Sequence, residues 1–298
     1  GEDHTNDWSI SDFTMDELRT WIGGKILDNA ADRPTDLNGK LPLISVQDVI
    51  DIASAKSKSL GRKISVYAET KNPYWNNQQA IANGCGKPGS SPFEDAVLAL
   101  LEKNKLNTKD SAIFLQSFDP ASLKYMRKAG LKAKAVQLVD GNDINYKDGS
   151  MGYITTDEWT FISGRPYSWT LAGDARTFGV MLTTAGLAEI KTYADGIGPW
   201  KPEVVAHSVV PYKDGAGLKD VNTLKDTGLI ADAHKAGLIV HSFTFRNEAG
   251  RLAGIYKGDP VAEYLTYYRL GIDGVFTDFT PTGLKARDAY KKELGVVF

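Results

Sequence analysis

The sequence predicts an α/β protein of the (β/α) barrel class, and three observations lead to this prediction. Strand-like and helix-like segments alternate from residue 43 to the end of the chain, which is the β-α-β pattern of a parallel sheet. Polar residues gather directly after the strand-like segments, as they do on the catalytic face of such barrels. The length of 298 residues suits one large core, so we expect a single barrel domain over residues 1–298.

The composition is that of an ordinary globular protein and argues against several other classes. Hydrophobic residues make up 42% of the chain and charged residues 24%. The formal net charge of −2 gives no sign of a nucleic-acid-binding protein, which usually carries a basic stripe. No apolar run approaches the roughly 20 residues that are needed to cross a membrane. The single cysteine, Cys85, excludes an internal disulfide and a multi-cysteine zinc site.

Each element is predicted from the spacing of apolar residues and from turn and capping signals. Six strands are expected, at residues 64–67, 112–118, 133–139, 194–199, 237–246 and 274–277. Helices are expected at residues 13–21, 43–53, 92–105, 120–130, 178–193, 221–236, 260–270 and 282–294. Residues 74–91 and 140–173 are predicted as long loops, and residues 204–210 as a further extended segment. A closed barrel of this class has eight strands, so we expect two strands to be absent from this chain.

The strand at residues 64–67 leads into a pair of opposite charges. Glu69 and Lys71 stand two residues apart, so strand geometry places both side chains on one face. Asn72 and Pro73 then end the strand. A carboxylate beside an ammonium at the mouth of a strand suits a metal ion and an anionic oxygen. The spacing alone favours the simpler interpretation, an exposed ion pair of minor energetic value.

Six short stretches occur in a fixed order along the chain, most of them at strand ends. They are Asp12-Phe-Thr-Met-Asp-Glu-Leu18, Tyr67-Ala-Glu-Thr-Lys-Asn-Pro73, Leu115-Gln-Ser-Phe118, Tyr193-Ala-Asp-Gly-Ile-Gly-Pro199, Val240-His-Ser-Phe-Thr-Phe-Arg246 and Val275-Phe-Thr-Asp-Phe279. Together they resemble the glycerophosphodiester phosphodiesterase family, in particular its larger, periplasmic bacterial branch. The resemblance implies a TIM barrel that hydrolyses glycerophosphodiesters to an alcohol and glycerol 3-phosphate. It also implies a divalent metal, usually Ca²⁺, and a periplasmic or secreted location.

The resemblance assigns roles to two residues by direct match. Glu69 matches the family's metal-binding glutamate, and Lys71 matches the adjacent lysine near the phosphate. A hard cation such as Ca²⁺ or Mg²⁺ prefers carboxylate oxygens, and it would polarise the phosphoryl oxygens. The lysine would add further stabilisation of the developing charge.

Three further residues at strand mouths are candidates for substrate binding. Phe118 and Trp200 would line the pocket for the glycerol and alcohol groups, although aromatic residues there also serve plain barrel packing. Arg246 would either hold a phosphate or pair with a loop acid. His241 lies within a predicted strand, which favours a structural histidine over a site residue. Composition alone suggests that Tyr74, Trp75 and the loop at residues 159–169 form a lip over either a carbohydrate or a headgroup.

The departures from the family are as informative as the matches. The family opens with a His-Arg pair on its first strand, a Glu-x-Asp on its second and a His-Asp in the hairpin that follows. This sequence contains none of the three. In the family the two histidines are the general acid and base, and the Glu-x-Asp supplies two metal ligands. We therefore expect an N-terminally incomplete enzyme whose acid–base pair belongs to an absent segment.

Two alternatives remain open at the level of the sequence. One is a catalytically inactive remnant or pseudoenzyme that binds a phosphorylated ligand or a partner, which the missing histidines favour. The other is a related phosphodiesterase that acts on a lipid headgroup. For the enzyme, the expected ligand is a small-molecule glycerophosphodiester.

Overall fold

The structure is a computed structural model that describes residues 8, 10–21, 23–24, 33–141, 143–145, 149–153, 164–209 and 221–296. The chain falls into two compact units, residues 1–66 and residues 67–298, which are described separately. Among the described residues, no helix combines the length and the apolar character that a membrane crossing requires.

The first unit contains a short 3-10 helix and two α-helices. They are η1 (Ile10–Asp12), α1 (Met15–Trp21) and α2 (Val46–Leu60). A capping box starts α1, because the Thr14 backbone N–H donates to the Glu17 carboxylate at 2.8 Å and the Glu17 N–H donates to the Thr14 hydroxyl. α2 has a capping box of its own at Ser45, and it runs further than the sequence predicts, ending at Gly61 in the left-handed conformation (φ 60°).

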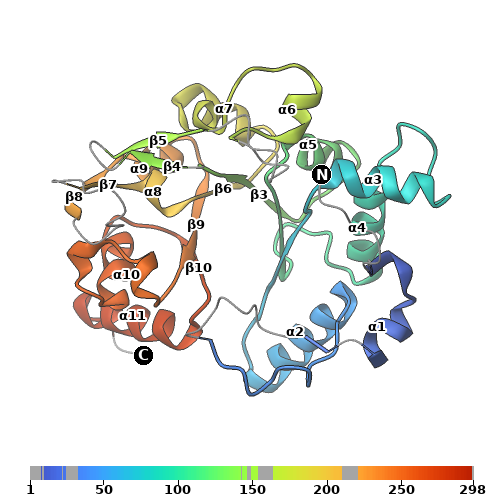
Figure 1. Ribbon diagram of the computed structural model, residues 1–298, viewed down its shortest axis with the longest axis horizontal. Helices are drawn as coiled ribbons and strands as arrows, with labels where there is room; N and C mark the ends of the chain where they lie inside the picture. The colour runs from blue at the N-terminus through green and yellow to red at the C-terminus, as the bar shows by residue number, and fades with distance from the viewer. Residues whose placement is uncertain are drawn as a thin grey trace. The chain divides into compact units, whose positions relative to one another are not determined.

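The second unit is organised around a six-stranded sheet (Figure 1), which confirms the predicted class and number of strands. In spatial order the strands are β1 (Val66–Glu69), β2 (Ile113–Ser117), β3 (Lys134–Val139), β6 (Gly196–Pro199), β9 (Ile239–Phe245) and β10 (Gly274–Thr277). The four pairings from β2 to β10 are parallel. Their register aligns Ser117 with Gln137 and Val139 with Pro199. The carboxyl ends of the strands therefore share one edge of the sheet.

The sheet is curled, so that its first and last strands approach each other. The Tyr67 ring of β1 stacks on Phe114 of β2 with the ring centroids 4.9 Å apart. The same ring meets Phe276 of β10 edge-on, with the centroids 4.8 Å apart. The Tyr67 hydroxyl also lies 3.0 Å from Nδ1 of His241 in β9. Four aromatic side chains thus fill the concave side, as interior side chains do in small barrels.

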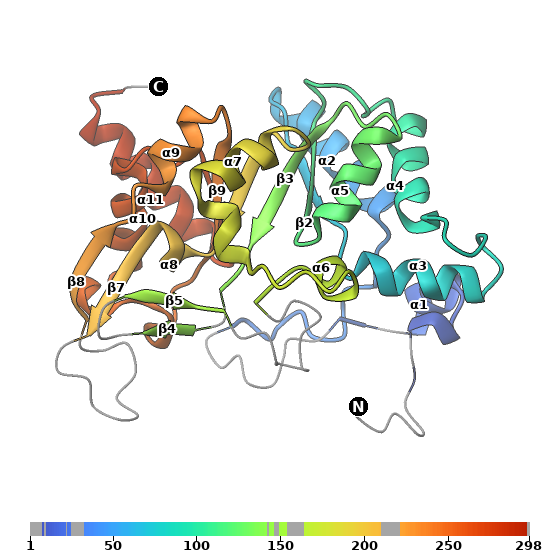
Figure 2. The same ribbon diagram turned by 90° about the horizontal axis from the view of Figure 1, so that it is seen from above.

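Helices cover the convex side of the sheet, and short elements connect them (Figure 2). The α-helices are α3 (Pro73–Ala82), α4 (Pro92–Lys103), α5 (Pro120–Lys128), α6 (Tyr167–Leu171), α7 (Thr184–Lys191), α8 (Lys201–Val204), α9 (Leu229–Lys235), α10 (Pro260–Arg269) and α11 (Thr280–Glu293). The 3-10 helices are η2 (Phe178–Leu182), η4 (Ala249–Arg251) and η5 (Gly254–Tyr256). α5 packs on β2 and β3, α7 on β6, and α9 on β9. Phe245 packs against Tyr264 and Tyr267 of α10 and forms part of the outer core.

Two predictions about the connecting segments are wrong. The expected loop at residues 74–91 begins with helix α3, which has no strong apolar face but starts at Pro73, a favourable first residue of a helix. The expected helix at residues 221–236 begins instead with a strand, β8 (Val221–Asp226). β8 pairs antiparallel with β7 (Val205–Val209), the extended segment that the sequence does predict. Its partner thus decides its conformation. A second hairpin, β4 (Asp143–Asn145) with β5 (Ser150–Gly152), lies within the long segment that follows β3.

Removal of the Tyr67 ring should destabilise the second unit strongly. Tyr67→Ala should lower the free energy of unfolding by about 3–4 kcal/mol, because a large buried ring that joins four strands is lost. Tyr67→Phe should cost about 1 kcal/mol, the contribution of one hydrogen bond. Chemical denaturation would measure both values, with Tyr290→Phe as a control that should change little. An unchanged midpoint for Tyr67→Ala would contradict the curled arrangement of the sheet.

Candidate functional site

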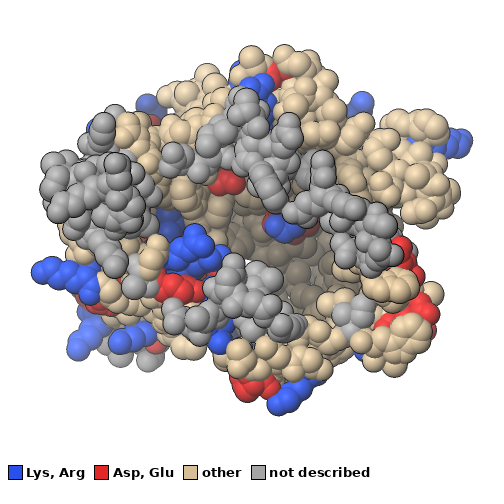
Figure 3. All heavy atoms as spheres, in the orientation of Figure 1, with Lys and Arg blue, Asp and Glu red and all other residues tan. Residues whose placement is uncertain are grey.

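Five side chains of interest follow five strands at the same edge of the sheet. Glu69 ends β1, Phe118 follows β2, Asp140 follows β3, Trp200 follows β6 and Arg246 follows β9. Because the carboxyl ends of parallel strands meet at this edge, their connecting loops build one shared site. Four of the five are predicted from the sequence, and Asp140 is not. On the face drawn in Figure 3, acidic and basic side chains of the described residues are interspersed.

Glu69 and Lys71 form the ion pair that their spacing predicts. Lys71 Nζ lies 3.3 Å from Glu69 Oε2, and the side chains are 75% and 17% exposed respectively. The turn that follows is fixed by Asn76, whose side chain donates to the Lys71 carbonyl at 2.7 Å, and by Asn72 in the left-handed conformation (φ 43°). The carboxylate is therefore sheltered at the strand mouth, while the ammonium remains accessible to an anion from solvent. The predicted roles on a metal and a phosphate stay predictions.

The two aromatic candidates are half-buried at this edge. The Phe118 ring packs edge-on against Phe178 and Phe243, with centroid distances of 6.1 Å and 5.8 Å. The Trp200 backbone N–H donates to the Val139 carbonyl at 3.1 Å, which extends the pairing of β3 and β6 by one residue. Phe118 thus takes part in barrel packing. Substrate binding by Phe118 and Trp200 stays a prediction.

Arg246 pairs with an acid of the neighbouring strand mouth, which is one of its two predicted roles. Its Nε lies 2.9 Å from Oδ2 of Asp278, directly after β10. The side chains are 34% and 28% exposed, so the pair stands at the edge of the site rather than beneath it. A phosphate that bound Arg246 would have to share the guanidinium with this carboxylate.

Asp140 and Glu203 form an acidic group that sequence reasoning missed. Burial raises the pKa of Asp140 to about 6, against the effect of a hydrogen bond from the Gly141 N–H. Burial also raises the pKa of Glu203, to about 8, and the nearby Asp140 charge adds to this shift. Glu203 accepts hydrogen bonds from the Trp200 N–H at 3.0 Å and from the Tyr153 hydroxyl at 3.3 Å. At neutral pH, Glu203 is therefore largely protonated.

The alternation of inward-facing and outward-facing residues along β3 indicates that Asp140 faces inward. Val136 and Leu138 face the concave side, where both lie close to Gly198 of β6, and Asp140 continues their series. The preceding polar residue, Gln137, is fully buried on the opposite face. Its amide donates to the Ser117 and Phe118 carbonyls and accepts from the Tyr193 hydroxyl at 3.0 Å. Gln137 is thus a structural tie between β2, β3 and α7.

A buried ion pair supports the segment that carries Trp200. Lys201 Nζ lies 2.8 Å and 2.9 Å from the two carboxylate oxygens of Glu263 in α10. The side chains are only 7% and 1% exposed. The Tyr267 hydroxyl donates to the Lys201 carbonyl at 2.8 Å. α8 is therefore fixed to α10, and the position of the adjacent Trp200 is fixed with it.

The described residues do not complete a site for a divalent metal. Within the described ranges, no group of three or more His, Cys, Asp or Glu side chains is placed to hold an ion. Glu69 is paired with Lys71 instead. His241 lies in the interior against Tyr67, as the structural interpretation of this residue expects. His234 pairs with Asp273 at 2.8 Å, and His4 lies outside the described residues.

The comparisons with known proteins bear directly on this arrangement. A sequence model of the glycerophosphoryl diester phosphodiesterase family matches residues 2–282. The chain belongs to this family. It is 30% identical to glycerophosphodiester phosphodiesterase GDPD6 of Arabidopsis thaliana over 273 residues, which cover 90% of the chain and 61% of that relative. It is 26% identical to a glycerophosphodiester phosphodiesterase of Haemophilus influenzae, with coverages of 80% and 57%.

The chain thus spans about 60% of the length of these two relatives, at 61% and 57%. Among solved structures, a putative glycerophosphoryl diester phosphodiesterase from Silicibacter pomeroyi aligns with a TM-score of 0.48 and 14% identity. The alignment covers 84% of this chain and 58% of the other.

The raised pKa of Glu203 predicts that stability falls with increasing pH. The folded state holds the proton more tightly than the unfolded state, in which the pKa is 4.5, and it loses this advantage as the pH rises towards about 8. The loss should reach about 1.4 kcal/mol per pH unit at most. Glu203→Gln should flatten this slope and raise stability at pH 8 in denaturation experiments. Glu189→Gln, at an exposed carboxylate with a lowered pKa, should give no such gain.

Because Lys201 and Glu263 form a buried ion pair, we expect the losses in unfolding free energy of the two single variants not to add up in the double variant. Lys201→Met should cost about 3–5 kcal/mol, because Glu263 would remain buried without its partner. Combining it with Glu263→Leu should recover most of this loss, since an apolar pair of similar volume needs no compensation. The free energies of unfolding of both single variants and the double variant would decide the point. Simple additivity of the two single losses would argue that the carboxylate and the ammonium act independently.

Proposed function

We propose that this chain provides the phosphate-binding edge of a hydrolase that converts glycerophosphodiesters into an alcohol and glycerol 3-phosphate. The observation that carries the proposal is the pairing of Glu69 and Lys71 at the mouth of β1, 3.3 Å apart, in a member of this family. The accessible Lys71 ammonium is suited to the negative charge of a phosphodiester. The sheltered Glu69 carboxylate keeps it oriented towards the strand edge.

The described residues suggest a division of labour around the phosphate. Lys71 would neutralise the charge that develops on the phosphoryl oxygens as the ester bond breaks, where electrostatic stabilisation is usually the largest contribution. Phe118 and Trp200 would form the apolar sides of the site, and Arg246 would contact the phosphate from the opposite side of the mouth. The pairing of Arg246 with Asp278 makes this last contact the weakest part of the assignment.

A divalent cation, Ca²⁺ or Mg²⁺, belongs to the proposal, with Glu69 as one ligand. The carboxylate chemistry of Glu69 suits either ion. The remaining ligands and the proton-transfer groups would have to come from residues outside the described ranges, because the described residues alone do not form such a site. We assign no step of the reaction to the metal for this reason. The resemblance to the periplasmic branch further leads us to propose a periplasmic or secreted location.

A second candidate function is binding without catalysis. The observation that favours it is that His207, His234 and His241, the described histidines, belong to a hairpin strand, an outer helix and the barrel interior. A protein with Glu69 and Lys71 but no proton-transfer pair would bind a phosphorylated ligand and release it unchanged.

Release of glycerol 3-phosphate from glycerophosphocholine, with Ca²⁺ and with EDTA, would test the proposal. Where an acid–base pair accompanies this chain, we expect metal-dependent release, lost in Glu69→Ala and reduced by at least about 100-fold in Lys71→Met, because one charge contact to the phosphate is removed. Lys71→Arg should retain part of the rate, and Lys87→Met, at an exposed lysine of a distant loop, should retain all of it. Binding without release would favour the second candidate. Neither binding nor release by a folded chain would overturn both.

A further inference from the structure

Tyr74 follows the Glu69 and Lys71 pair closely along the chain. It occupies the first turn of α3, three residues after Lys71, and its side chain is 42% exposed. The next residue, Trp75, is 46% exposed. Large aromatic side chains that are exposed at the mouth of a site are not explained by core packing. The first turn of α3 therefore presents aromatic surface to whatever binds at Lys71.

Tyr167 reaches the same place from a distant part of the chain. Its ring centroid lies 5.5 Å from that of Tyr74, with the ring planes tilted by 53°. The adjacent Ser168 N–H donates at 3.0 Å to Oδ2 of Asp119, the residue that follows Phe118 at the mouth of β2. Figure 2 shows α6 beside α3 accordingly. The two tyrosines thus stand over the mouths of β1 and β2.

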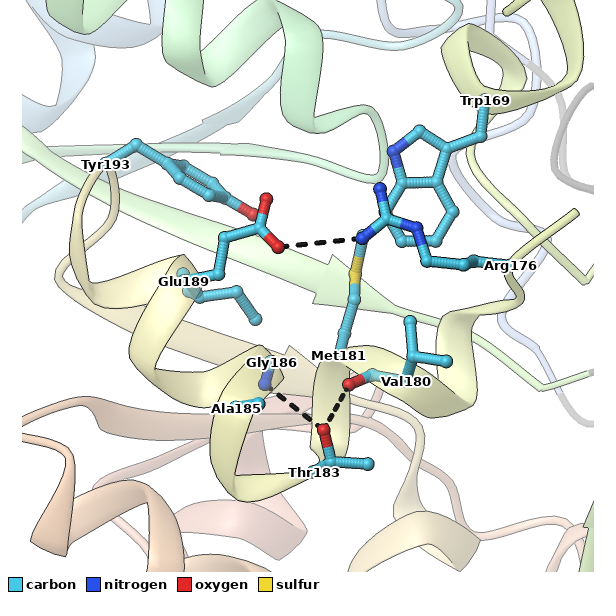
Figure 4. A pocket seen from close by; sticks show the side chains of 10 residues that line it. Trp169, Arg176, Val180, Met181, Thr183, Ala185, Gly186, Glu189 and Tyr193 are labelled. Carbon is cyan, nitrogen blue, oxygen red and sulfur yellow. Dashed lines mark hydrogen bonds and ion pairs between the residues drawn. The ribbon is translucent and has the colours of Figure 1, made fainter. Parts of the chain in front are cut away.

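The segment that carries Tyr167 is held from its far side as well. The Arg176 guanidinium lies 4.3 Å from the centre of the Trp169 ring and 3.7 Å from Glu189 of α7, around a cavity of about 150 Å³ (Figure 4). Asp174 pairs with Arg176 at 2.7 Å, and its backbone N–H donates to the Trp169 carbonyl at 2.8 Å. α6 is therefore fixed to α5 through Asp119 and to α7 through Arg176. The position of the Tyr167 ring is preorganised.

The aromatic faces of the tyrosine pair favour a cationic ligand. The faces of aromatic rings carry negative electrostatic potential and attract cations. Asp119 is tied to the segment that carries Tyr167, and its two carboxylate oxygens accept from the backbone N–H groups of Ala121 and Ser168. It therefore contributes negative charge rather than an open hydrogen-bond acceptor. Two tilted rings suit a quaternary ammonium better than a neutral polyol, which requires several convergent hydrogen bonds.

We propose that Tyr74 and Tyr167 bind the alcohol part of the phosphodiester, and that they select an alcohol that carries a quaternary ammonium group. The assignment rests on the proposed function for the position of the phosphate, at Lys71. A phosphate held there places one ester substituent towards α3 and α6 and the other towards Trp200. The glycerol moiety then faces Trp200, and the cationic group enters the angle between the two tyrosine rings.

Calorimetric titration of the full chain with two diesters would test this assignment. Glycerophosphocholine carries the quaternary ammonium, and glycerophosphoglycerol carries a neutral polyol in its place. We expect tighter binding of glycerophosphocholine, weakened roughly tenfold by Tyr74→Leu or Tyr167→Leu, the size of a partly desolvated cation–π contact. Binding of glycerophosphoglycerol should change less than about twofold. Tyr74→Phe and Tyr167→Phe should retain the preference because they keep the ring, and Tyr290→Leu, at a tyrosine of α11, should leave both diesters unaffected.

The outcomes separate this inference from the proposed hydrolysis. Circular dichroism would establish that each variant is folded, and release of glycerol 3-phosphate would be followed in parallel. Ring-dependent preference for glycerophosphocholine without release would support the headgroup site while the hydrolytic function fails. Equal weakening of both diesters in the leucine variants, a preference for glycerophosphoglycerol, or binding of neither diester would overturn the headgroup site, whether or not hydrolysis is observed.

Discussion

The contacts of Tyr67 are the constraint on which the second unit depends. A six-stranded parallel sheet can lie open, with its two edge strands far apart. Here one ring on the first strand touches a ring on the last strand and bonds to a histidine beside it, so the sheet must curl. Curling brings the carboxyl ends of the strands around a common centre. Without it, Glu69 and Trp200 would stand on a flat edge and could not face the same ligand.

Around this centre, oppositely charged side chains form ion pairs both at the exposed rim and in the buried interior. The rim has two partly exposed ion pairs, Glu69 with Lys71 and Arg246 with Asp278. A ligand can disrupt such a pair at a modest cost in free energy. Deeper, Lys201 and Glu263 are sealed from water, and their pairing fixes geometry because neither charge tolerates the loss of the other. Glu203 is a third case, since it lowers the cost of burial by keeping its proton. The accessible pairs suit binding, and the buried groups suit support.

Local sequence patterns predict those elements of the fold whose conformation is set by residues that are close in the sequence. β10 lies at Gly274–Thr277 as predicted, since a short apolar run between a glycine and a polar turn leaves little choice. The pairing of Glu69 with Lys71 follows from the two-residue repeat of a strand in the same way. β8 was mistaken for a helix because its conformation is set by β7 rather than by its own residues. Asp140 was missed because its raised pKa is caused by burial, which exists only in the folded chain. The alternation along β3 nevertheless predicts the face of the sheet on which Asp140 lies.

The way in which α6 is fixed has a consequence for how this protein can change. Asp119 holds α6 through the main-chain N–H of Ser168, a group that every residue except proline possesses. The cation–π contact that supports the far side belongs to Trp169 and not to Tyr167. The tie to Asp119 therefore depends on the backbone of residue 168 and not on its side chain. In evolutionary terms, position 168 can take any residue except proline and still keep this bond to Asp119.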